Sequence, residues 1–259
     1  MIEAAGITYR VDNRELVSGV SISFAPGRLH MLIGPNGAGK STLIKILARF
    51  LRPSHGQIKY EGFDISHASE RDLAVRRAVL SQAVEVAFPL SVREVVMMGR
   101  YPHFAGRPSV ADQEICNEVM KFFDIEELSD RNYQTLSGGE RQRVNFARVL
   151  AQVWRPINNS CRFLFLDEPL TFLDIRHQID FMKKVKTFAN TPDVVAIGVV
   201  HDLNLASRFA DQILLLNKGR LVTAGTSEEV LTDENIRKVF AVNPIFVQTP
   251  NSATHLIFD

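Results

Sequence analysis

The sequence predicts an α/β fold with a mostly parallel core sheet, an N-terminal antiparallel β-subdomain and an inserted helical subdomain. The parallel core follows from continuous apolar runs at 163–166, 194–200 and 213–216, because strands buried on both faces of a sheet show no polar alternation. The antiparallel part follows from alternating apolar and polar residues within 1–33. From about 83 to 153 the apolar residues recur at helical spacing instead, which indicates an inserted helical block.

The individual elements follow from the same patterns in chain order. Strands are expected at 29–33 and 57–60, on either side of a helix at 40–50. Three further helices are expected at 92–100, 111–123 and 139–153. The tail 220–259 has the pattern of short strands and helices. We therefore expect residues 1–259 to form a single nucleotide-binding domain, with a catalytic core at 1–82 and 155–259 and a helical subdomain at 83–154.

The composition is that of an ordinary globular protein. The 259 residues carry a net charge of +1, so bulk charge indicates no nucleic-acid partner. The longest strongly apolar run, 194–200, is far shorter than the roughly 20 residues of a membrane-spanning helix. Two scattered cysteines, Cys116 and Cys161, are typical of structural thiols in a reducing compartment.

A glycine-rich loop is the strongest chemical signal in the chain. It fits the phosphate-loop pattern between a strand and a helix, and consists of Gly34, Pro35, Asn36, Gly37, Ala38, Gly39, Lys40, Ser41 and Thr42. The glycines let backbone N–H groups converge on a β-phosphate, while Lys40 reaches the β- and γ-phosphates. The Ser41 hydroxyl is a ligand for Mg²⁺ in this pattern. The loop therefore predicts binding of ATP together with Mg²⁺.

Polar residues also follow two of the buried strands. The run 163–166 ends in Asp167 and Glu168, and two carboxylates there are costly unless a cation or hydrogen bonds compensate them. Asp167 fits the acid on the Mg²⁺ side, and Glu168 fits the group that orients the attacking water. His201 follows the run 194–200, where it can contact the γ-phosphate and hold Glu168 and the attacking water in register. The alternatives are an acidic helix cap and a structural histidine, and the phosphate loop favours the catalytic interpretation.

A second phosphate site is predicted at 136–140, where the residues read Leu-Ser-Gly-Gly-Glu. Ser137, Gly138 and Gly139 stand at the start of the predicted helix 139–153. A hydroxyl and two glycines at a helix N-terminus suit a phosphate, because backbone N–H groups there point outward. The chain thus carries two phosphate sites about a hundred residues apart.

Together these motifs resemble those of the ATP-binding-cassette (ABC) ATPases, a family of phosphate-loop NTPases, over nearly the whole chain. The features that occur in the family's order are the phosphate loop, Gln82, the segment 136–140, the acidic strand 163–169, Asp174 and His201. The resemblance implies that two cassettes pair head to tail. Each ATP would then lie between the phosphate loop of one subunit and the Ser137, Gly138 and Gly139 of the other.

The resemblance implies roles for three more residues. Tyr9 matches the aromatic residue that stacks on adenine, with an ordinary sheet-face tyrosine as the alternative. Gln82 matches the residue that senses Mg²⁺ and the γ-phosphate, and Asp174 matches the acid that contacts the other subunit. One departure is the sequence Leu-Thr-Phe-Leu at 170–173, where the family often has Thr-Ser-Ala-Leu. The bulkier residues are expected to alter packing at the dimer seam and to leave the acids in place.

The segment 87–103 resembles ATPases of importers for iron–siderophores, haem and vitamin B12. Its prolines and aromatic residues fit a groove for a short helix of a membrane partner, although Ser91 and Glu94 also fit a simple helix cap. Residues 76–82 and the loop 152–161 resemble the haem-import branch. Haem is therefore the expected transported molecule. A ferric siderophore or vitamin B12 is the alternative, and a soluble non-transport ABC ATPase is a distant one.

For such an importer, the resemblance implies a peripheral ATPase subunit at the cytoplasmic face of the bacterial inner membrane. The implied partners are a second copy of the chain, two transmembrane permease subunits and, through the permease, a periplasmic substrate-binding protein. Neither nucleic acid nor haem is expected to touch this chain, so His103 is not expected to ligate iron.

Overall fold

A six-stranded, mostly parallel sheet forms the centre of the fold. The computed structural model describes residues 1–80, 88–170, 173–248 and 254–258. The strand order is β10-β9-β3-β8-β7-β6, and the bounds are Arg220–Gly225, Gln212–Asn217, Arg28–Ile33, Val194–Val199, Arg162–Leu166 and Arg77–Leu80. Neighbours from β9 to β6 pair in parallel, and β10 pairs antiparallel with β9. The predicted fold class is therefore confirmed for the core.

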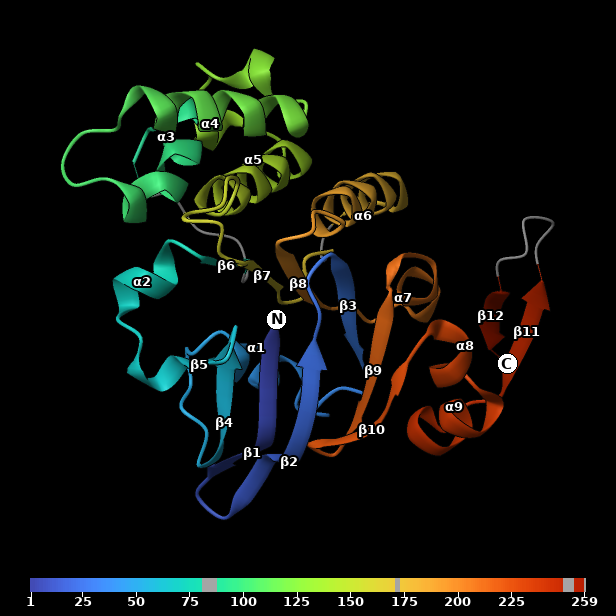
Figure 1. Cartoon of the computed structure of the whole chain (residues 1–259). Helices are drawn as coiled ribbons and strands as arrows, with labels where there is room; N and C mark the ends of the chain where they lie inside the picture. The colour runs from blue at the N-terminus through green and yellow to red at the C-terminus, as the bar shows by residue number, and fades with distance from the viewer. Residues whose placement is uncertain (81–87, 171–172, 249–253, 259) are drawn as a thin grey trace.

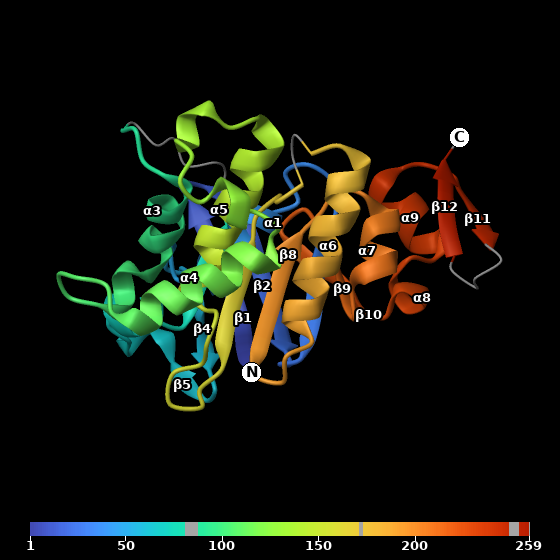
Figure 2. The same cartoon turned by 90° about the horizontal axis from the view of Figure 1, so that it is seen from above.

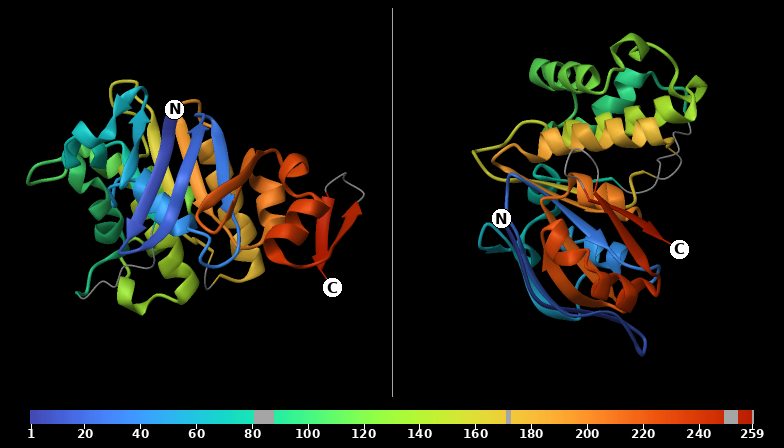
Figure 3. Two further views of the ribbon diagram at one scale, coloured as in Figure 1. Left: turned by 90° about the horizontal axis from the view of Figure 1, so that it is seen from below. Right: turned by 90° about the vertical axis from the view of Figure 1, so that its right-hand side faces the viewer.

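A four-stranded antiparallel sheet packs beside this core (Figure 1). Its order is β2-β1-β4-β5, with bounds Arg14–Phe24, Ile2–Val11, His55–Tyr60 and Phe63–Asp64. Helix α1 (Lys40–Leu47) lies between the two sheets, as the side view in Figure 3 shows. Leu43 and Ile44 of α1 share one hydrophobic cluster with side chains of both sheets. The antiparallel part predicted from 1–33 is thus present.

Helices cover the opposite face of the six-stranded sheet. The chain between β6 and β7 contains α3 (Val92–Met97), the 3-10 helix η2 (Met98–His103), α4 (Val110–Phe122) and α5 (Gly138–Gln152). Helices α6 (Ile175–Ala189) and α7 (Leu203–Phe209) follow β7 and β8. Seen from above, α5, α6 and α7 lie side by side over the sheet (Figure 2), and α4 packs on α5 on the side away from the sheet (Figure 1). The inserted helical block is therefore confirmed as part of the fold.

The strands of the core are buried on both faces. In β7, Phe163 and Phe165 pack toward α1, whereas Leu164 and Leu166 pack toward the helices on the other side. Alternate side chains of a strand point to opposite faces, so both sets must be apolar when both faces are covered. This explains why the core strands read as continuous apolar runs.

Several elements differ from the expectation in length or were not expected. The helix predicted to reach residue 50 ends at Leu47, because Arg49 adopts a left-handed conformation with φ 57°. The helix predicted at 92–100 continues as the 3-10 turn η2, where a Cβ on Gly99 would lie 2.0 Å from the carbonyl oxygen of Arg148. The short helix α2 (Glu70–Ala74), strand β6 and helices α6 and α7 were not predicted as separate elements.

The C-terminal part consists of α8 (Ser227–Val230), α9 (Asp233–Phe240) and a hairpin of β11 (Pro244–Gln248) and β12 (Thr254–Phe258). Within the described residues, no helix is long and apolar enough to cross a membrane. Both cysteines are free, and burial raises the pKa of the Cys116 thiol to about 11. That thiol therefore stays protonated at neutral pH, as a structural thiol should.

A buried ion pair in the helical block gives the first testable prediction. Arg100 Nε donates to Asp112 Oδ1 at 3.0 Å, and the two side chains are only 7% and 6% exposed. Asp112→Asn would leave the buried guanidinium without a counter-charge, which typically costs about 3–5 kcal/mol. We expect the free energy of unfolding, measured by urea titration, to fall by that amount.

The matched control for this variant is Asp72→Asn. Like Asp112, Asp72 accepts a hydrogen bond from the hydroxyl of its helix-capping serine, but its side chain is exposed at the surface. The control should lose no more than about 1 kcal/mol, as is usual for a helix-cap residue. Equal losses in both variants would contradict a special contribution of the Arg100–Asp112 pair.

Candidate functional site

The phosphate loop joins β3 to α1 at the end of the parallel sheet. Its conformation depends on glycine, because Gly34 and Gly39 have φ values of 146° and 96°. A Cβ on Gly34 would lie 2.2 Å from the carbonyl oxygen of Leu216, and one on Gly39 would lie 2.4 Å from that of Leu16. The loop therefore packs its backbone directly against the ends of β9 and β2.

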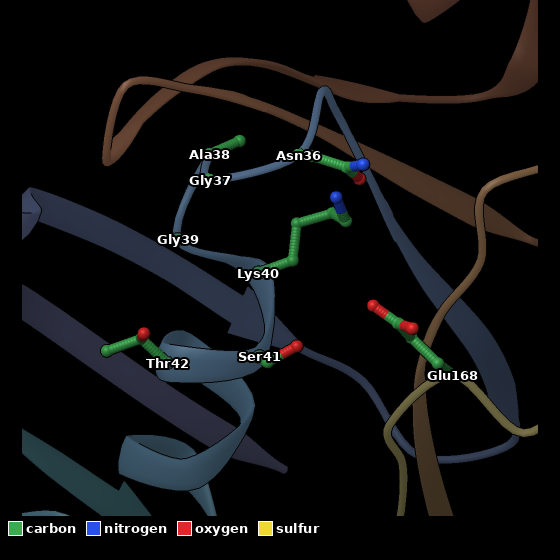
Figure 4. A pocket seen from close by; sticks show the side chains of 8 residues that line it. All are labelled: Asn36, Gly37, Ala38, Gly39, Lys40, Ser41, Thr42 and Glu168. Carbon is green, nitrogen blue, oxygen red and sulfur yellow. The ribbon is translucent and has the colours of Figure 1, made fainter.

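A pocket of about 190 Å³ opens over this loop. Its lining consists of Asn36, Gly37, Ala38, Gly39, Lys40, Ser41, Thr42 and Glu168. Figure 4 shows the Glu168 carboxylate facing the loop from the other side, toward the space beside Lys40 and Ser41. The predicted phosphate-loop residues and Glu168 thus come together in one cavity.

Lys40 supplies the positive charge of the pocket. Its side chain is buried, and its Nζ donates to the carbonyl oxygens of Gly34 at 2.8 Å and Pro35 at 3.0 Å. Burial lowers the pKa of Lys40, while the nearby carboxylates of Glu168 and Asp167 partly oppose this effect. The loop thus holds a cation at the place where a phosphate would bind.

Glu168 and His201 meet although they follow different strands. Glu168 Oε1 lies 2.9 Å from His201 Nε2, and both side chains remain partly exposed, at 39% and 48%. Glu168 adopts a left-handed backbone conformation with φ 53°, which is uncommon outside glycine. Strained residues of this kind occur often at active sites, where the surrounding structure holds them in place. The pairing of these two predicted residues is therefore consistent with a shared role.

Asp167 occupies the end of β7 next to Glu168. Its backbone N–H donates to the carbonyl oxygen of Leu80 in β6 at 2.9 Å, which fixes the strand end. Its Oδ1 atom is buried and has no hydrogen-bond partner among the described residues. A buried carboxylate oxygen without a partner is costly, so this atom suits a cation or a bound water.

The second predicted phosphate site lies at the start of α5 and outside the pocket. Ser137 caps this helix, and its hydroxyl donates to Glu140 Oε2 at 2.8 Å in a capping box. Gly138 and Gly139 differ from the other thirteen glycines, all of which lie in the described ranges. They alone combine an ordinary φ with no heavy atom within 4 Å of an added Cβ. None of the described residues of this subunit therefore requires glycine at these two positions.

The remaining predicted residues are placed less directly. Tyr9 pairs with Val17 across β1 and β2, next to the Leu16 carbonyl that packs against Gly39, and it is partly buried. Asp174 caps α6 with its side chain 65% exposed, and its Oδ2 lies 2.7 Å from His177 Nδ1. Gln82 lies outside the described residues, as do Thr171 and Phe172 of the departure noted above.

One residue that supports the site was not predicted. Gly219, in the turn between β9 and β10, donates its N–H to the Ala38 carbonyl at 3.0 Å and accepts from Ser18 N–H at 2.8 Å. It therefore links the phosphate loop to β2. The local sequence Asn-Lys-Gly offers a turn signal, and Lys218 and Gly219 both have positive φ values, 46° and 77°.

The sequence profile of the ABC transporter family matches residues 17–171, more than half of the chain. This chain belongs to the ABC transporter family. The resemblance inferred from the motifs is therefore confirmed, and with it the ATPase fold and nucleotide binding.

Relatives within the ABC transporter family cover almost the whole chain. A protein of Gloeobacter violaceus named hemin import ATP-binding protein HmuV is 41% identical over 257 residues, which is 99% of this chain and 93% of the relative. A protein of the same name from Rhizobium meliloti is 42% identical over 93% of this chain and 91% of its own length. A chain of an ABC transporter solved in an inward-facing conformation superposes with a TM-score of 0.83 at 24% identity, covering 100% of this chain and 96% of its own.

Proposed function

We propose that this chain is the ATP-hydrolysing, energy-coupling subunit of a bacterial haem importer. The observation that carries the proposal is the near full-length identity of 41–42% to relatives named as hemin import ATP-binding proteins. The geometry of the site supports an active ATPase, since Glu168 and His201 meet at the pocket over the phosphate loop. Import of a ferric siderophore or of vitamin B12 remains the alternative.

In the proposed reaction, Lys40 and the backbone of the phosphate loop hold the phosphates of ATP. Glu168 orients and polarises the water that attacks the γ-phosphorus, because its carboxylate faces the loop across the cavity. His201 holds the Glu168 carboxylate through the 2.9 Å contact of its Nε2 atom, and in this proposal the same side chain also contacts the γ-phosphate. The same proposal gives Gln82 a role next to the γ-phosphate.

The residues present fit a bound Mg²⁺. The described residues contain no cluster of three or more His, Cys, Asp or Glu side chains that could hold a metal alone. Mg²⁺ usually binds to one or two protein oxygens together with substrate phosphates, so such a cluster is not required. Ser41, Gln82 and, through water, the Oδ1 atom of Asp167, which has no hydrogen-bond partner among the described residues, would hold it. Bound Mg²⁺ supplies positive charge that offsets the charge of the phosphates.

We also propose that two copies of the chain share each ATP. Ser137 and Gly138 are exposed, and no described part of the same subunit fills the space beside Gly138 and Gly139. Glycine in a helix costs up to about 1 kcal/mol relative to alanine, so two glycines without an internal reason suggest an external one. The phosphates of ATP on a second copy are that reason, because a helix N-terminus attracts anions. Tyr9 would stack on adenine and Asp174 would contact the second copy.

The proposed membrane partners are two permease subunits, which act with a periplasmic substrate-binding protein. Phe88, before α3, and Tyr101, in η2, are 72% and 59% exposed, so their rings are available to another protein. We propose that 88–103 receives the permease and that the chain is peripheral at the cytoplasmic face of the inner membrane.

We also propose that the chain divides into a catalytic core at 1–82 and 155–259 and a helical subdomain at 83–154.

Reconstitution in liposomes tests the transported molecule. The subunit would be combined with its native permease and binding protein, and both ATP hydrolysis and uptake would be measured. Haem-loaded binding protein should stimulate hydrolysis several-fold and drive haem uptake, whereas ferric siderophore and vitamin B12 should do neither. Stimulation by a ferric siderophore without an effect of haem would overturn the haem assignment and leave the ATPase proposal intact.

A further inference from the structure

The C-terminal hairpin is hydrogen-bonded to α7, the helix that follows His201. Strand β12 lies beside α7 (Figure 1). The side chain of Asn204, in the first turn of α7, makes the connection. Asn204 Nδ2 donates to the carbonyl oxygen of Leu256 at 3.0 Å, and Leu256 N–H donates to Asn204 Oδ1 at 2.8 Å. One amide side chain therefore pairs with both polar backbone atoms of one strand residue.

The attachment of β12 is concentrated at this point. Leu256 is 4% exposed and joins the main hydrophobic core, whereas Ile257 and Phe258 are 53% and 41% exposed. Leu256 stands opposite Phe246 of β11, but its N–H and carbonyl groups bond to Asn204. The Asn204 amide thus acts as a strand neighbour on the outer edge of β12.

His201 lies directly before the same turn of α7. Asp202 caps the helix, and its Oδ1 accepts from the N–H groups of Asn204 at 2.7 Å and Leu205 at 3.1 Å. His201 immediately precedes this cap and is too exposed for packing alone to fix its position. The backbone from 201 to 204 is therefore held by the helix cap and by the link from Asn204 to β12.

We propose that Asn204 is a positioning residue for His201, with β12 as its anchor. The proposal rests on the catalytic role proposed above for His201. The two hydrogen bonds between Asn204 and Leu256 hold the first turn of α7, so that His201 Nε2 stays within reach of the Glu168 carboxylate. Small misplacements of a catalytic group are costly, because a shift of about 1 Å can lower a rate by up to about a hundredfold.

The test compares kinetics of the full-length chain carrying Asn204→Ala, His201→Ala or both. Asn204→Ala should lower kcat about tenfold and change KM for ATP less than about twofold, because the phosphate-loop side of the pocket is untouched. In the His201→Ala background, Asn204→Ala should cause no further loss of kcat, since both act through one residue. Asn235→Ala is the matched control, because Asn235 also bonds a backbone carbonyl, that of Val230, at 2.9 Å in the C-terminal part.

The outcomes separate this proposal from the proposed function. Wild-type kcat in His201→Ala would refute the role of His201 itself. A low kcat in His201→Ala with wild-type kcat in Asn204→Ala would overturn only the positioning role, and so would an equal further loss in the double variant. Should Asn204→Ala fail to fold, Asn204→Asp serves instead, because it keeps the acceptor for Leu256 N–H and loses the donor. It should then lower kcat in the wild-type background only, and wild-type kcat in Asn204→Asp would overturn the proposal.

Discussion

Glu168→Gln is expected to lower kcat for ATP hydrolysis by about 10²–10⁴-fold and to leave ATP affinity nearly unchanged. Glutamine keeps the shape of the side chain but lacks the negative charge that polarises the attacking water. Glu168 lines the pocket opposite the phosphate loop, and its Oε1 lies 2.9 Å from His201 Nε2. The loss should therefore fall on the chemical step, while the binding groups of residues 36–42 stay in place.

Phosphate release at saturating ATP and equilibrium binding of a fluorescent ATP analogue measure the two effects separately. Because the variant binds ATP without hydrolysing it, size-exclusion chromatography with ATP should show a stable dimer. The matched control is Glu234→Gln on α9, an exposed glutamate outside the pocket, which should hydrolyse ATP like the wild type. If Glu168→Gln retains the wild-type kcat, the role proposed for Glu168 is wrong.

Two inactive variants should restore activity when they are mixed. Lys40→Ala removes the cation of the subunit's own pocket, and Ser137→Arg places bulk and charge at the start of α5. Each variant alone damages both sites of a symmetric dimer. A mixed dimer instead has one site with an intact phosphate loop facing an intact Ser137, and one site damaged on both sides. With random pairing, turnover should recover to at most about a quarter of the wild-type value, and to less where both sites must act together.

Ser109→Arg is the control for the loss of a helix cap, because Ser109 caps α4 through the same kind of capping box as Ser137. It should remain active alone, since that position lies outside the proposed shared site. The readout is phosphate release over a range of mixing ratios, with a maximum near equal amounts. Full activity of Ser137→Arg alone, or of the wild-type monomer at dilutions where no dimer forms, would contradict the shared site.

Much of the fold could be predicted because its signals are local. The runs at 163–166 and 194–200 report burial on both faces directly, and they became β7 and β8. Strand β6 has only four residues and begins with Arg77, so it lacks such a run. Helix α6 carries Phe181, Met182, Val185 and Phe188 at helical spacing, a signal that could have been used.

Part of the candidate site could likewise be predicted from local sequence, and part of it could not. The phosphate loop is one continuous segment, so its glycines, Lys40 and Ser41 could be named from spacing alone. The roles given to Tyr9, Gln82 and Asp174 came from resemblance and stay predictions. The structure adds open space beside Gly138 and Gly139, which no pattern of residues could reveal, because open space depends on what the rest of the chain leaves unfilled.

The sequence by itself determined the family, the phosphate loop and the layered α/β core. These properties depend on residues that are adjacent in the chain or that are spaced by the period of a helix or strand. Only the tertiary structure gives the 2.9 Å geometry of the contact between Glu168 and His201, the hydrogen bonds of Gly219 with Ala38 and Ser18, and those between Asn204 and Leu256. Each of these contacts joins different elements, and its geometry depends on strand order and helix packing. No periodic pattern of residues signals such contacts, because they form only when burial of the core brings distant segments together.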